Sequence, residues 1–90
     1  MTHLIHDVAR LTPRIRRLKG QVAALEKAMA GQPECIAVLT QIAAIRGAAQ
    51  GLLLEVLEGH MQAHVAGEKN PARRSAEVAA VHKVLRSYLK

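Results

Sequence analysis

Residues 33–64 form the longest stretch with a helical pattern in this 90-residue chain. Apolar and small side chains recur there alternately three and four positions apart, the spacing of a stripe along one side of a helix that packs on other helices. The stripe consists of Cys35, Val38, Ile42, Ile45, Ala49, Leu52 and Val56. The pattern predicts one long helix from Pro33 to His64 whose stripe is covered by another helix.

Side chains that bind transition metals stand at opposite ends of this predicted helix. Cys35 lies in the first turn, whereas His60 and His64 are four residues apart on one face near the end. About 37 Å separates Cys35 from His60 along an α-helix, so one helix cannot close a site that includes both. An antiparallel second copy, crossing near Ala48 and Ala49, brings Cys35 of one chain beside the two histidines of the other. The sequence therefore predicts a homodimer with two shared sites.

Four residues together support metal binding, and they are His3, Cys35, His60 and His64. His3 joins the set only if the N-terminal arm folds back. Each residue alone is a weak signal, because a lone helical cysteine is more often a small core residue and paired histidines often face solvent. The combination is stronger, since the packing stripe indicates the antiparallel pairing independently of the ligands. A thiolate with two or three imidazoles suits Zn(II), Co(II) or Ni(II).

Composition and local signals predict an all-α fold of three helices in a single domain over residues 1–90. Half of the chain is apolar, with one Tyr and no Phe or Trp, so helix packing and oligomerisation must supply the core. The first helix is expected to begin at Pro13, unless an earlier turn precedes it or the helix kinks there, and to end at Gly31. Pro33 fits the first position of the second helix. Asn70 followed by Pro71 marks the start of the third.

The formal charge of +6 and the pI near 10.3 indicate a polyanionic partner, with nucleic acid favoured over a membrane surface. No Asp or Glu occurs between Val8 and Leu25, so the basic residues there lack the alternating charges of an ordinary solvated helix. Phosphate contacts explain this excess. The candidate DNA contacts are Arg14, Arg17, Lys19, Gln21 and Arg46, with Arg10 and Arg16 beside them. No helix-turn-helix or zinc-finger spacing is present.

Several classes of protein are disfavoured by what the sequence lacks. No Ser-His-Asp arrangement or Gly-rich phosphate loop is discernible, and neither His60 nor His64 follows a Glu at the spacing used by di-metal oxidases, so an enzyme is not expected. No apolar run approaches the roughly 18 residues of a membrane span. The N-terminal residues lack the pattern of a signal peptide. We expect a cytoplasmic protein without a membrane partner.

Four stretches of the chain resemble the CsoR/RcnR family of bacterial metal- and aldehyde-sensing transcriptional repressors. They are RRLKGQVAALEKAM, ECIAVLTQIAAIRGAAQGL, LEVLEGHMQAH and VLRSYLK, and the resemblance covers nearly the whole chain. It implies an all-α fold without a helix-turn-helix, an antiparallel helical dimer core, and a dimer of dimers that binds operator DNA as a homotetramer. It also implies that metal binding weakens DNA binding and so derepresses an efflux gene.

Comparison within that family implies a Ni(II)- or Co(II)-responsive repressor, with Zn(II) as a further candidate. Nickel and cobalt sensors of the family carry the set His, Cys, His, His, which matches His3, Cys35, His60 and His64. Copper(I) sensors place a second Cys where His64 stands. This chain departs from some relatives at Ala63, where they carry a Glu. Two alternatives stay open: a formaldehyde-sensing repressor that uses Cys35, and a metal-buffering helical protein without a DNA function.

The resemblance extends to the basic residues. The matching positions are Arg14, Arg17, Lys19, Gln21 and Arg46. The family therefore implies that these residues contact the operator.

Overall fold

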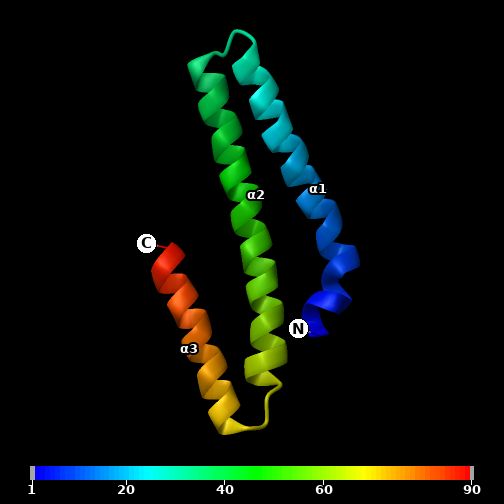
Figure 1. Ribbon diagram of the computed structural model, residues 1–90, viewed down its shortest axis with the longest axis vertical. Helices are drawn as coiled ribbons and strands as arrows, with labels where there is room; N and C mark the ends of the chain where they lie inside the picture. The colour runs from blue at the N-terminus through cyan, green and yellow to red at the C-terminus, as the bar shows by residue number, and fades with distance from the viewer. Residues whose placement is uncertain (1, 90) are drawn as a thin grey trace. The chain divides into compact units, whose positions relative to one another are not determined.

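The computed structural model describes residues 2–89, except for the side chains of residues 2, 3, 5 and 6. Its elements are α1 (Thr2–Ala30), α2 (Cys35–Met61), the π-helical segment η1 (Gln62–Ala66), which continues α2, and α3 (Pro71–Tyr88) (Figure 1). No strand occurs among residues 2–89. The predicted all-α fold of three helices is therefore confirmed.

The contacts divide the chain into two units, Met1–Val56 and Leu57–Lys90. The first unit holds α1 and most of α2, which run antiparallel as a helical hairpin joined by a short loop (Figure 1). The second unit holds the end of α2, η1 and α3. The candidate DNA contacts belong to the first unit, and the two histidines near the end of α2 belong to the second.

Of the alternatives left open at Pro13, the structure selects a helix that starts upstream: α1 begins at Thr2, and Pro13 lies inside it rather than at its first position. Proline has no N–H, so the carbonyl of Ala9 lacks its usual helical donor. Packing upstream sustains the helix, because Leu11 is only 5% exposed and is the one buried apolar side chain among the described residues. Gly31 ends the helix as predicted, with its N–H donating to the carbonyl of Ala28 at 3.3 Å.

Helix α2 begins at Cys35, two residues after the predicted start at Pro33. The carboxylate of Glu34 caps the helix: Oε1 accepts from the N–H of Ile36 at 3.1 Å, and Oε2 accepts from the N–H of Ala37 at 2.7 Å. Two N–H groups of the first turn, which have no partner inside the helix, are satisfied in this way. A negative charge at this end also opposes the positive end of the helix dipole.

The predicted helix to His64 changes geometry in its last turn. From Gln62 to Ala66 the chain is π-helical, and the N–H of Gly67 donates to the carbonyl of Gln62, five residues back, at 2.9 Å. A Cβ atom at Gly67 would lie 2.9 Å from that carbonyl oxygen, closer than real Cβ contacts allow. Glycine is therefore required where the π turn closes. Single π turns inside α-helices occur frequently at functional sites.

The start of α3 agrees with the sequence prediction. Oδ1 of Asn70 accepts hydrogen bonds from the N–H groups of Ala72 at 2.9 Å and Arg73 at 3.2 Å. Pro71 occupies the first helical position, where its missing N–H costs nothing. A polar cap before a proline depends only on neighbouring residues, so the start of this helix can be predicted without knowledge of the tertiary fold.

The predicted stripe on α2 is only partly covered within one chain. The half-buried members recur seven residues apart: Val38, Ile45 and Leu52. A second series with the same spacing remains exposed: Cys35, Ile42 and Ala49. The hairpin therefore uses one side of the stripe and leaves the other without a covering element among the described residues.

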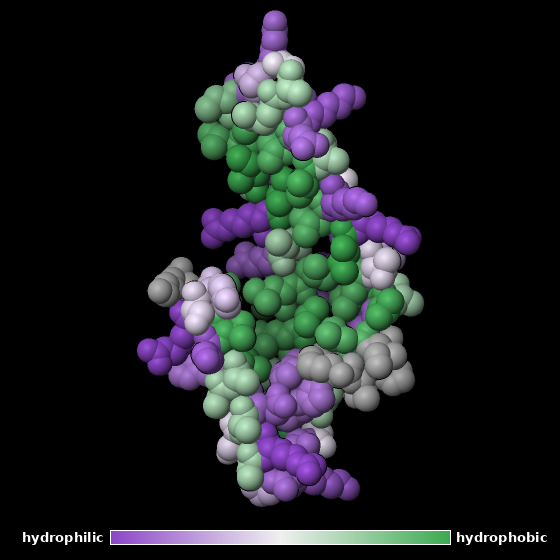
Figure 2. Space-filling view, in the orientation of Figure 1, coloured by the Kyte–Doolittle hydropathy of each residue, from purple (hydrophilic) through white to green (hydrophobic). Residues whose placement is uncertain are grey.

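Helix α1 also carries an apolar series that the hairpin does not bury. Its members recur every seven residues and are each roughly half exposed: Val8, Ile15, Val22 and Met29. Figure 2 shows hydrophobic residues, in green, over much of the visible face of the hairpin. Contiguous apolar surface of this kind commonly marks an interface with another protein.

The expectation that no apolar stretch approaches the length of a membrane span is wrong. Residues Cys35–Ala66 form a helix long and apolar enough, by length and composition, to cross a membrane. The core helix of a soluble protein passes the same test. Arg46 lies in the middle of the helix, and a charged side chain at the centre of a bilayer costs about 2.5–3.5 kcal/mol on insertion scales.

Candidate metal site and nucleic-acid interface

The histidine pair comes together where α2 passes into η1. The ring centroids of His60 and His64 are 4.8 Å apart, with the ring planes inclined at 42°. His60 lies in the last turn of α2 and its side chain is 17% exposed, while His64 lies in the π turn and is half-buried. Two imidazoles this close can present nitrogens to one ion. The predicted juxtaposition of the two rings is confirmed.

A carboxylate from α3 supports His60. Nε2 of His60 lies 2.8 Å from Oε2 of Glu77. Metal-binding histidines almost always donate their second ring N–H to such a group, which fixes the tautomer and the ring orientation. In the tautomer that donates Nε2–H to Glu77, Nδ1 carries the lone pair that a metal requires. Sequence reasoning missed Glu77, because only the reversal of the chain between η1 and α3 brings it to His60.

The other two members of the predicted metal set lie elsewhere in the chain. Cys35 is an exposed free thiol at the first position of α2, at the opposite end of that helix from His60. His3 belongs to α1, but its side chain lies outside the described residues. Among the described residues of one chain, no three His, Cys, Asp or Glu side chains form a group that could hold a metal. In chemical type, the thiol and the imidazole pair fit a borderline transition ion.

The basic surface of α1 meets an acidic residue that sequence reasoning did not anticipate. Nη1 of Arg14 lies 2.7 Å from Oε1 of Glu55, and Nη1 of Arg10 lies 3.2 Å from Oε2 of the same carboxylate. Nη2 of Arg10 also lies 3.3 Å from Oδ2 of Asp7. The sequence between Val8 and Leu25 contains no acid, but the hairpin brings one across from α2. The interpretation that this surface lacks compensating charge is therefore wrong at its Arg10 and Arg14 end.

Gly51 makes room for the Arg14 guanidinium. A Cβ atom at Gly51 would lie 3.0 Å from Nη2 of Arg14, so a larger side chain would displace that group. This point lies beside Ala48 and Ala49, where the predicted antiparallel copy crosses. Among the described residues, a Cβ atom at Gly47 would meet nothing within 4 Å beyond its own helix backbone, whereas Gly51 borders an arginine.

The remaining candidate DNA contacts differ in their surroundings. Arg17, Lys19 and Arg46 are exposed, and none forms an ion pair within residues 2–89. Gln21 is half-buried, and its Oε1 accepts no hydrogen bond from the described part of the chain. At 3.6 residues per turn, Arg14, Arg17 and Gln21 share one side of α1, while Lys19 lies about 140° around the helix from Arg14. Three of the candidate contacts on α1 therefore lie on one side of that helix, and Lys19 does not.

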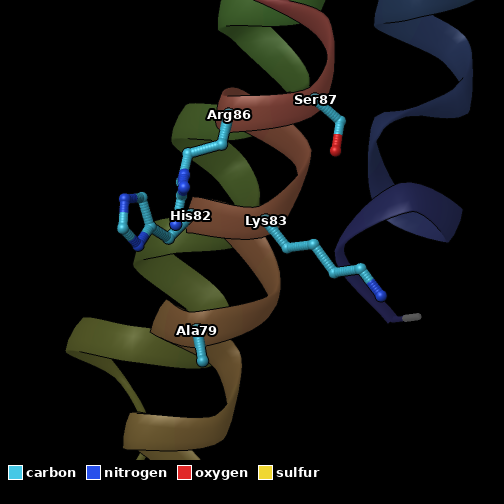
Figure 3. A pocket seen from close by; sticks show the side chains of 5 residues that line it. All are labelled: Ala79, His82, Lys83, Arg86 and Ser87. Atoms are coloured by element: carbon cyan, nitrogen blue, oxygen red, sulfur yellow. The ribbon is translucent and has the colours of Figure 1, made fainter.

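Helix α3 carries a further cationic surface that sequence reasoning did not single out. His82, Lys83, Arg86 and Ser87 line a shallow hollow together with Ala79. Figure 3 shows His82 and Arg86 pointing to one side of the helix, and Lys83 and Ser87 to the other. Six of the thirteen Lys and Arg residues and three of the seven acidic residues belong to Leu57–Lys90, which leaves this unit a formal charge of +3. The positive charge of the protein is therefore not confined to α1.

Comparison with known proteins identifies the family. Residues 7–87 match the family described as metal-sensitive transcriptional repressor. The chain is 47% identical to an uncharacterized protein in the bioA 5′ region of Serratia marcescens and 46% identical to the transcriptional repressor RcnR of Salmonella paratyphi B, each over the full length of both chains. A solved structure of a variant of the formaldehyde-responsive regulator FrmR, from Salmonella enterica serovar Typhimurium, is similar with a TM-score of 0.82 and 44% identity, covering 92% of this chain and 94% of that one.

The fold and the matched residues together define a small all-helical regulator of transcription. The chain belongs to the family of metal-sensitive transcriptional repressors, as the sequence resemblance implied. The members of this family act as repressors rather than as enzymes.

Proposed function

We propose that this protein is a Ni(II)- or Co(II)-responsive repressor whose 90 residues act as one domain. It binds operator DNA without metal and releases the DNA on metal binding, which derepresses a metal-efflux gene. The observation that carries the proposal is the pair of half-buried histidine rings 4.8 Å apart, one of them held by Glu77, in a chain of this repressor family. We place the protein in the cytoplasm, with operator DNA and copies of itself as partners and no membrane partner.

The proposed metal site is shared between protomers. His60 and His64 supply two imidazoles, and Cys35 of the partner subunit supplies the thiolate. His3, near the start of α1, completes the set. Sharing is required because Cys35 and His60 belong to opposite ends of the continuous helix α2, about 37 Å apart along its axis. A bound ion would supply a positive centre that links the start of α1 to the dimer core.

Exposed apolar surface supports the proposed assembly. The uncovered series on α2, which includes Cys35 itself, would face a second copy in an antiparallel dimer. Burial of Ile42 and the half-exposed Ile15 and Val22 would give the dimer a core that the single chain lacks. The family resemblance implies that two such dimers associate. The resulting tetramer would present several copies of the basic surface to one operator.

The choice of metal follows from the donor set. A thiolate with two or three imidazoles binds Ni(II), Co(II) and Zn(II) well, and a site without a second thiolate is poorly matched to Cu(I). A relative that is 46% identical is named as the transcriptional repressor RcnR, which supports a repressor function for this chain. We favour Ni(II) or Co(II) on the resemblance of the ligand positions, with Zn(II) as a further candidate effector.

A formaldehyde-sensing repressor is the second candidate, and two observations favour it. Cys35 is an exposed free thiol, and the 44% identical structural relative is a formaldehyde-responsive regulator. The Cys35 thiolate would add to the formaldehyde carbon, and the resulting hydroxymethyl group would bridge to the N-terminal amine with loss of water. Family membership disfavours the metal-buffering alternative, because a buffering protein has no role for DNA.

One titration separates these candidates. The metal-free protein first selects a tight-binding duplex from a random-sequence pool, and the complex is then titrated with Ni(II), Co(II), Zn(II), Cu(I) and formaldehyde. We expect Ni(II) and Co(II) to release the DNA with a change in affinity of about 5–150-fold, the usual range of allosteric coupling. Release by formaldehyde alone establishes the second candidate. Failure of the metal-free protein to bind any duplex contradicts both repressor proposals.

The contact between Glu77 and His60 makes a separate prediction about metal affinity. Glu77→Gln keeps the size of the side chain but removes its charge, so it no longer favours the tautomer that donates Nε2–H. We expect Ni(II) affinity to fall by about 10-fold, the lower end of the range for outer carboxylate partners. Competition with a chelator of known affinity measures the change.

The matched control is Glu68→Gln, which removes the same charge from the same unit. The carboxylate of Glu68 accepts from the N–H of Asn70 and makes no described contact with His60. Equal Ni(II) affinity of the two variants would show that Glu77 does not orient His60 for metal binding.

A further inference from the structure

We propose that Glu55 sets the DNA specificity of the basic surface by competing with DNA phosphates for Arg14 and Arg10. In the free protein its carboxylate holds both guanidinium groups. A duplex whose sequence-dependent shape places its phosphates against both arginines displaces the carboxylate, and duplexes of other shape do not. The inference rests on the proposed DNA-binding function. It adds Glu55, a residue of α2 that the sequence pattern did not indicate as part of the DNA-binding surface.

One carboxylate bridges two successive turns of α1. Arg10 and Arg14 are four residues apart and so project from the same side of the helix. Oε1 of Glu55 lies 2.7 Å from Arg14, and Oε2 lies 3.2 Å from Arg10. The side chains of Arg14 and Glu55 are 36% and 31% exposed, so this pair is screened less by solvent and salt than an ordinary surface pair.

The two ends of the basic surface differ in charge. With Asp7 included, the two arginines at the first end are balanced by two carboxylates. One turn further along the same side, Arg17 is exposed and has no ion pair within residues 2–89. Uncompensated cations attract phosphate regardless of base sequence. Arg17 therefore supplies general affinity, while Arg10 and Arg14 contribute only when they exchange a carboxylate for a phosphate.

The geometry leaves Arg10 able to make this exchange. Oε2 of Glu55 is buried yet accepts no hydrogen bond from the described residues, so Arg10 is held by charge at 3.2 Å without a well-directed hydrogen bond. The Arg10 side chain is also 53% exposed. Arg14 is held more firmly, with Nη1 on the carboxylate and Nη2 beside the open position at Gly51. A phosphate that approaches from solvent can thus draw Arg10 away first.

The Glu55 carboxylate mainly changes how well the protein discriminates between duplexes. Its negative charge repels every phosphate backbone, but only a well-placed duplex recovers the loss by pairing with both arginines. Specificity is a difference of affinities, and an element that penalises the wrong partner increases it. The relevant quantity is therefore the ratio of affinities for selected and random duplexes rather than either affinity alone.

The test is Glu55→Gln, which preserves the side-chain shape and one carbonyl oxygen for Arg14. Binding of the metal-free full chain to a random-sequence duplex is measured over a salt series, beside the selected duplex. We expect random-duplex affinity to rise by about 3–10-fold at low salt, and the slope of log K against log salt to steepen by about 0.9 for each additional phosphate that the protein neutralises. Affinity for the selected duplex rises less, so the specificity ratio falls.

Two matched controls separate this effect from a general gain of positive charge. Glu26→Gln on α1 and Glu58→Gln on α2 remove the same charge from exposed residues that have no ion pair in the described part of the chain. We expect both to change random-duplex binding far less than Glu55→Gln. Nickel affinity should be unchanged in all three variants, since none of these residues belongs to the proposed metal site.

A variant without both arginines tests whether Glu55 acts through them. In an Arg10→Ala, Arg14→Ala background, Glu55→Gln should alter DNA binding no more than the control substitutions do. The proposal is overturned if Glu55→Gln in the intact protein matches the controls, or if it weakens random-duplex binding, because Glu55 would then orient the arginines rather than compete for them. Failure of the proposed DNA function is distinguishable, since the wild-type chain would then show no salt-dependent binding at all.

Discussion

Cys35→Ala is expected to lower Ni(II) affinity by more than about 100-fold, because even the outer partners of a metal ligand contribute 10–100-fold. The side chain is exposed and lies at the first position of α2, so its removal should not disturb the hairpin. The same loss is expected for a protein with both His60→Ala and His64→Ala. Chelator competition measures each affinity.

Mixing these two defective proteins should restore binding. If the site is shared across an antiparallel dimer, each heterodimer contains one site with an intact Cys35 and an intact histidine pair, and one site with neither. Subunit exchange is verified with differently tagged chains, and Ni(II) bound per heterodimer should approach one. A mixture that binds no more metal than its components, despite exchange, excludes the shared site.

His82→Ala is the matched control for the histidine substitutions. His82 is an exposed imidazole on α3 that lies outside the 4.8 Å pair of His60 and His64. Its removal should leave Ni(II) affinity unchanged. A large loss in this variant would indicate that metal binds elsewhere on the chain.

Local signals in the sequence predicted the ends of the helices with mixed success. Asn70 and Pro71 place the start of α3 correctly, because a side-chain cap depends only on residues within one turn. Pro33 does not start α2, since the adjacent Glu34 carboxylate satisfies the free N–H groups and fixes the first helical residue at Cys35. The π turn after Met61 also lay beyond prediction, because its closure depends on the tight approach at Gly67.

The residues that sequence reasoning missed act through tertiary contacts. Glu55 reaches Arg14 only because α1 and α2 form an antiparallel hairpin, and Glu77 reaches His60 only because the chain reverses before α3. A charge pattern within one helix cannot show an acid supplied by another. The sequence does contain a trace of this contact. Gly51 and Glu55 are one turn apart on α2, and both border Arg14 in the hairpin. Sequence spacing alone was sufficient to predict that His60 and His64 lie close together, because the two residues occupy consecutive turns of one helix.

Arg17→Ala is expected to reduce operator affinity by at least about 10-fold, and by more than Arg14→Ala does. Arg17 is exposed without an ion pair in residues 2–89, so it can meet a phosphate directly, whereas Arg14 must first leave Glu55. Each phosphate that the variant no longer neutralises should reduce the slope of log K against log salt by about 0.9, and an assembly that presents several copies multiplies the effect.

A salt series on the selected duplex, with Ni(II) affinity as a second readout, checks this prediction. Lys27→Ala is the control, because it removes one exposed positive charge from the same helix about three turns away. Backbone contacts are independent of base sequence, so Arg17→Ala should weaken random and selected duplexes by similar factors and leave metal binding unaffected. If its salt slope matches that of Lys27→Ala, the side of α1 that bears Arg14, Arg17 and Gln21 does not face DNA.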